Sequence, residues 1–110
     1  MIITKTEKYT HIKPTQNSFC DFLNNFKNRY IEFIDQHLII DFSEKINIKI
    51  EELTLFLKLS VKHKQNGTSF VLICGDIDID DTPDEIAIVP TFTEALDILE
   101  MDAIERDLGF

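Results

Sequence analysis

Six acidic side chains crowd the segment between residues 76 and 85: Asp76, Asp78, Asp80, Asp81, Asp84 and Glu85. Carboxylate oxygens are the ligands that Ca²⁺ and Mg²⁺ prefer, so this acidic loop is the first place to look for chemistry. A calcium loop that began at Asp76 would need a glycine at its sixth position and a glutamate at its twelfth. The chain has Asp81 and Ala87 there. The alternation of Ile and Asp favours a solvated strand edge that resists strand addition, and no metal ligand is assigned.

The side chains that most often perform catalysis are few and scattered. The three histidines, His11, His37 and His63, form no closely spaced pair of the kind that binds zinc. Three glycines cannot supply a phosphate-binding or dinucleotide-binding loop. Cys74 is the last residue of a predicted strand, and the acidic residues after it disfavour a reactive thiolate. We therefore expect a protein that is not an enzyme and that uses no cofactor.

Charge is distributed very unevenly along the 110 residues, whose formal net charge is -9. Residues 1–66 hold ten basic and eight acidic residues, whereas residues 67–110 hold one basic and twelve acidic residues. Such a surface repels nucleic acid and anionic membranes, and it suits a protein partner with a basic patch. No apolar run approaches the roughly 18 residues that span a bilayer. Two widely separated cysteines are typical of a reducing compartment, so we expect a cytoplasmic protein.

The hydrophobic pattern predicts the elements that must position any site. Two short antiparallel strands are expected within residues 2–13, and an amphipathic helix with an aromatic stripe over 18–35. Continuous apolar runs predict buried strands at 37–42, 69–74 and 86–89, with helices over 50–65 and from Thr91 onward. Ser18 and Thr91 are the predicted N-caps. The chain should be one α/β domain, residues 1–110, in the order β-β-α-β-α-β-loop-β-α. We expect a mixed sheet of four to five strands with three to four helices on one side.

The strand–helix–strand segment at 37–75 calls for a parallel pair of strands joined by a right-handed crossover. In open sheets of this kind, function gathers where a strand ends and the next helix begins. Here that junction runs from Asp41 to Glu52.

Three segments resemble the STAS domain, the fold of anti-sigma factor antagonists. Residues 38–43 (LIIDFS) are similar to the family's strand, which reads apolar-apolar-apolar-Asp-Leu-Ser. Residues 53–73 resemble its next helix, its glycine-containing turn and its following strand, and residues 88–96 resemble its closing strand and helix. Regulated members carry Asp-Ser-Ser-Gly at the start of the helix, where a kinase phosphorylates a serine. In this chain the corresponding positions are Lys49, Ile50, Glu51 and Glu52.

The resemblance implies a bacterial, non-catalytic regulatory module that binds a protein partner and is not switched by serine phosphorylation. Six residues are its predicted partner-binding residues: Asp41, Ser43, Lys49, Ile50, Glu51 and Glu52. A homodimer through the helix at 50–65 is a third hypothesis. The alternative function is a small-ligand or divalent-metal-binding domain that uses Asp41, Cys74 and the acids of residues 76–85.

Overall fold

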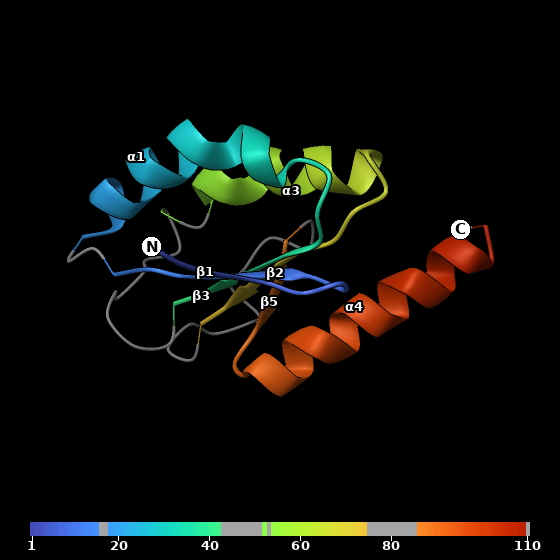
Figure 1. Ribbon diagram of the computed structural model, residues 1–110. Coiled ribbons are helices and arrows are strands. Elements are labelled where there is room, and N and C mark those ends of the chain that lie inside the picture. The colour runs from blue at the N-terminus through green and yellow to red at the C-terminus, as the bar shows by residue number, and fades with distance from the viewer. Residues whose placement is uncertain (16–17, 43–51, 53, 75–85, 110) are drawn as a thin grey trace.

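A five-stranded mixed sheet is the centre of the computed structural model, which describes residues 1–15, 18–42, 52, 54–74 and 86–109 (Figure 1). Within these residues the strands lie side by side in chain order: β1 (Ile2–Lys5), β2 (Thr10–Lys13), β3 (Leu38–Asp41), β4 (Phe70–Ile73) and β5 (Ala87–Val89). β1 pairs with β2 antiparallel, and every later pair is parallel. The predicted α/β domain with a mixed sheet is confirmed.

Three α-helices are found in the described residues: α1 (Phe19–Arg29), α3 (Leu57–Gln65) and α4 (Phe92–Asp107). Helix α1 begins where the Ser18 hydroxyl accepts the Asp21 backbone N–H at 3.2 Å. Helix α4 begins in the same way, with the Thr91 hydroxyl accepting the Glu94 backbone N–H at 3.3 Å. Both predicted N-caps are therefore confirmed, because each satisfies a backbone donor that the helix leaves unpaired.

The helices cover both faces of the sheet, which corrects the prediction that they lie on one side. Figure 1 shows α1 and α3 above the sheet and α4 below it. The strand residues alternate accordingly: Leu38, Ile40 and Leu72 pack with α1, whereas Ile39 and Val71 pack with α4. The physical reason is visible in the apolar runs themselves. A strand that is apolar at every position needs cover on both faces.

Two predicted helices are shorter as α-helices than their patterns indicated. The helix expected over 18–35 changes at Tyr30 into a 3₁₀ helix, Tyr30–Phe33, which delivers Phe33 into the core. The helix expected over 50–65 has a 3₁₀ turn at Thr54–Phe56 before α3, and residues 50, 51 and 53 lie outside the described residues. Beyond α3, Gly67 adopts a φ of 81°, the left-handed conformation that ends many helices.

The larger core is rich in phenylalanine and lies between the sheet and helices α1 and α3. The stripe predicted on the first helix faces this core, with Phe22, Phe26 and Phe33 fully buried. Over the described part of the chain, no helix has the length and apolar character needed to cross a bilayer.

Candidate functional site

The structure describes two of the six predicted partner-binding residues. Asp41 is the last residue of β3, and Glu52 is half-buried ahead of the 3₁₀ turn that leads into α3. The other four lie outside the described residues: Ser43, Lys49, Ile50 and Glu51. The acidic loop at 76–85 is outside them as well.

Asp41 lies on the α4 side of the sheet and is only 8% exposed. Its Oδ2 is 3.2 Å from Nε2 of His11, which belongs to the neighbouring strand β2. The His11 imidazole in turn rests against Phe92, the first residue of α4, with ring centroids 5.0 Å apart. A carboxylate that holds an imidazole can orient it for proton transfer. Among the described residues, however, no group of three potential metal ligands is found here or elsewhere.

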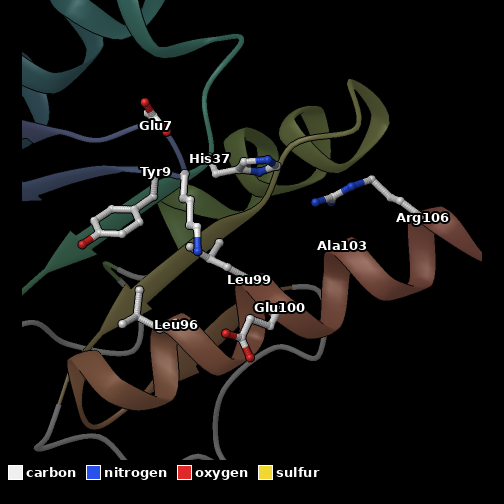
Figure 2. A pocket seen from close by; sticks show the side chains of 9 residues that line it. Glu7, Tyr9, His37, Leu96, Leu99, Glu100, Ala103 and Arg106 are labelled. Atoms are coloured by element: carbon white, nitrogen blue, oxygen red, sulfur yellow. The ribbon is translucent and has the colours of Figure 1, made fainter.

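A cavity of about 570 Å³ lies at the other end of the parallel strands, between α4 and the residues that precede β2 and β3 (Figure 2). Its apolar wall comes from Tyr9 and from the inward side of α4. Charged and polar side chains complete it. The lining residues are Glu7, Lys8, Tyr9, His37, Leu96, Leu99, Glu100, Ala103 and Arg106.

A chain of hydrogen bonds organises the polar end of this cavity. The Ser69 backbone N–H donates to His37 Nδ1 at 2.9 Å, and the Ser69 hydroxyl donates to Asp102 Oδ2 at 2.8 Å. Arg106 Nη1 donates to the same hydroxyl at 3.4 Å. Burial lowers the pKa of His37, the positive charge of Arg106 lowers it further, and Asp102 opposes them. His37 is therefore a neutral imidazole with its proton on Nε2, because Nδ1 must accept.

A second histidine, His63 on α3, is fully buried and has a structural role. Its Nδ1 accepts the Tyr30 hydroxyl at 2.7 Å, and its Nε2 donates to the Phe33 carbonyl at 3.3 Å. Burial lowers the pKa of His63, while hydrogen bonds to backbone carbonyls partly offset this. Burial also raises the pKa of Tyr30. The two hydrogen bonds of His63 join α3 to the 3₁₀ helix that continues α1.

The outward side of α4 carries an apolar stripe in solvent. Met101 and Ile104 on α4 and Leu108, its C-cap residue, are 56%, 59% and 66% exposed, and their spacing of three and four residues places them on one side of the helix. The opposite side of α4 packs on the sheet through Ala95, Leu96 and Leu99. We call Met101, Ile104 and Leu108 the outer stripe. This part of α4 extends beyond the edge of the sheet in Figure 1.

Sequence reasoning did not find the cavity, because its residues come from three distant segments. Tyr9, His37 and Arg106 form no motif, and only the parallel pairing of β2 and β3 brings the first two together. One signal was present in the sequence. Arg106 is the sole basic residue among residues 67–110, so its position among twelve acids was conspicuous.

Comparison with known proteins assigns the chain to no family. No protein-family model matches it, and no curated protein is similar enough in sequence to count as a relative.

Proposed function

We propose that this protein is a non-catalytic, STAS-like regulatory module of the bacterial cytoplasm that binds another protein. The observation that carries the proposal is the outer stripe of α4. A helix that covers a sheet normally turns polar residues to water, and α4 does so only in part. Contiguous exposed apolar side chains on a soluble domain commonly mark an interaction surface.

The charges around the outer stripe indicate the chemistry of the partner. Asp97 and Glu105 are exposed on the same helix, and Arg106 is the only basic residue of α4. A partner that places apolar side chains on the stripe and basic side chains on these acids would match both features. This agrees with the partner with a basic patch that the overall charge suggests. Burial of apolar area would supply most of the affinity, at about 25 cal/mol per Å² before the costs of association.

The STAS-like segments support a regulatory module and argue against a phosphorylation switch. The strand that resembles the family's strand is β3, with Asp41 at its carboxyl end. At the positions where regulated members carry the phosphorylated serine, this chain has Lys49, Ile50, Glu51 and Glu52. Without a hydroxyl at those positions, a kinase has no acceptor there. Cys20 and Cys74 form no disulfide with each other, as a reducing compartment favours.

A second surface is the one predicted from sequence, over residues 44–52 and the exposed side of the helix at 50–65. Two described residues favour it, since Leu55 and Val61 are both exposed apolar side chains near or on α3. It could bind the same partner or a second copy of the chain. The experiment must therefore separate this surface from the outer stripe.

Affinity capture from the native host, with the purified chain as bait, tests the proposal. Three variants are compared with the wild type: Met101→Glu/Ile104→Glu on α4, Leu55→Glu/Val61→Glu near α3, and Ile31→Glu. Ile31 is 79% exposed on the α1 side, so its variant is the matched control for adding charge to an exposed apolar position. Circular dichroism confirms that each variant folds.

We expect a specific partner that the wild type and Ile31→Glu retain and that Met101→Glu/Ile104→Glu loses. Loss with Leu55→Glu/Val61→Glu alone would assign binding to the second surface. If no protein is captured more by the wild type than by both double variants, the proposed function is wrong. Light scattering on the same samples tests the homodimer hypothesis.

A further inference from the structure

We propose that the cavity between α4 and the amino ends of β2 and β3 binds a small amphipathic monocarboxylate. The carboxylate lies between His37 and Arg106, and the apolar part lies along Leu96 and Leu99. This inference does not depend on the outer stripe, which lies on the other side of α4. The sequence indicated residues 76–85 as a site for a small ligand. The cavity is a different site.

Size and shape fit a small organic ligand. A volume of about 570 Å³ falls within the roughly 300–1,000 Å³ that is typical of ligand pockets. Figure 2 shows Leu96, Leu99 and Ala103 along the side of α4 that lines the cavity, with the charged Glu100 beside Leu99. His37 and Arg106 lie toward one end and reach toward one another, while Tyr9 and Leu96 lie toward the other end. A ligand with one polar end and an apolar body matches this arrangement.

His37 supplies a fixed, neutral donor. Its Nδ1 is held by the Ser69 backbone N–H at 2.9 Å, which leaves Nε2–H as the donor of the ring. A carboxylate oxygen is the natural acceptor for such a group. Because the ring orientation is set by backbone, little freedom is lost when a ligand binds.

Arg106 supplies the charge. Its Nη1 contacts the Ser69 hydroxyl at 3.4 Å, which directs the guanidinium toward His37. Arg106 belongs to neither of the two pairs within 4.0 Å that join one described residue to another, His11–Asp41 and Arg29–Glu32. The favourable interaction of a cation with the last turn of α4 explains an arginine at this position. It does not explain why the side chain reaches toward the cavity. Guanidinium and carboxylate form strong paired hydrogen bonds.

The remaining charges favour a monoanion over a phosphate. Lys8 and Arg106 line the cavity together with Glu7 and Glu100, and Asp102 lies at its polar end through the hydrogen bond from Ser69. With His37 neutral, these two cations and three carboxylates sum to a charge of -1. The whole chain carries a formal charge of -9. The negative potential of the protein would therefore repel a ligand with two negative charges more strongly than a monocarboxylate.

Nuclear magnetic resonance of the isotope-labelled full chain tests the inference, with octanoate as the probe and 1-octanol as its neutral counterpart. We expect saturable shifts at millimolar octanoate, confined to residues that line the cavity, and weaker binding of 1-octanol. The imidazole signals of His37 should show a higher pKa in the presence of octanoate, because a bound anion favours the protonated ring. Partner capture plays no part in this readout, so the two proposals fail separately.

Arg106→Gln removes the charge and shortens the side chain but leaves a polar amide, and it should weaken octanoate binding by about tenfold. The matched control is Arg29→Gln, which removes an exposed arginine paired with Glu32 on the α1 side. That variant should bind octanoate like the wild type. Octanoate shifts that are absent from the cavity, or that persist unchanged in Arg106→Gln, would overturn the inference. So would equal affinities for octanoate and 1-octanol.

Discussion

Replacing Phe26 by alanine should be among the most destabilising single changes in this protein. Phe26 lies on α1 and its side chain is fully buried at the centre of the larger core. Removing a buried phenylalanine side chain typically costs about 3–5 kcal/mol, through lost burial and the cavity left behind. Contacts with neighbouring aromatic rings place the expected loss toward the upper end of this range. Five rings have centroids 5.8 to 6.5 Å from that of Phe26: Phe22, Tyr30, Phe33, Phe56 and Phe70.

Urea unfolding followed by circular dichroism measures the effect. At about 0.05–0.15 kcal/mol per residue, a domain of 110 residues has a free energy of unfolding of about 5–15 kcal/mol. Phe26→Ala should therefore remove about a fifth of it or more. With a denaturant slope of about 1–3 kcal/mol/M, the midpoint should fall by about 1 M or more. The slope itself should not change.

Ile31→Ala is the matched control, because Ile31 lies in the 3₁₀ helix that continues α1 and is largely exposed. Its free energy of unfolding should stay within about 0.5 kcal/mol of the wild type. Phe26→Leu keeps most of the apolar volume and should fall between the two. A loss below about 1 kcal/mol for Phe26→Ala would refute the reasoning, since the described packing could not then be the main support of α1.

Three further predictions concern the buried polar groups and the turn after α3. The free energy of unfolding should be highest well above pH 6.5, the ordinary pKa of histidine, and should fall as the pH drops through that value and below it. The pKa values of His63 and His37 are lowered on folding, so at lower pH the unfolded chain binds protons more readily than the folded chain. Urea unfolding midpoints between pH 8 and pH 5 measure the loss of stability, and a midpoint that does not change with pH would contradict the prediction. Tyr30→Phe should cost about 1–3 kcal/mol by the same assay, because His63 Nδ1 loses its donor, and a neutral result would show that the hydrogen bond contributes nothing. Gly67→Ala should cost about 1 kcal/mol in thermal unfolding, because Gly67 has a positive φ that alanine rarely adopts. An added Cβ would meet no atom within 4 Å, so the cost is conformational and not steric. No change in melting temperature would mean that the turn relaxes.

Local patterns were enough to predict the elements and the main core. The apolar runs at β3 and β4, the aromatic stripe of α1, and the capping residues Ser18 and Thr91 act over a few neighbouring residues, so their effect can be read from spacing alone. The same runs also required helices on both faces of the sheet. The one-sided arrangement was wrong because it left Ile39 and Val71 without cover.

Contacts between distant segments could not be predicted in this way. His11 and Asp41 are 30 residues apart and meet only because β2 and β3 pair in parallel with one particular register. The cavity depends further on α4, which carries Arg106 back to the amino end of β3 beside His37. No sequence spacing encodes these meetings, because they follow from sheet register and helix placement.

Calorimetric titration of the purified partner into this protein tests the central claim that the outer stripe of α4 binds a protein. The account predicts that Met101→Glu/Ile104→Glu weakens binding by at least about 30-fold, the loss of about 2 kcal/mol that one hot-spot residue contributes. It also predicts that added salt weakens binding to the wild type, because the acids of α4 face a basic partner. Equal dissociation constants for the wild type and Met101→Glu/Ile104→Glu would contradict the account.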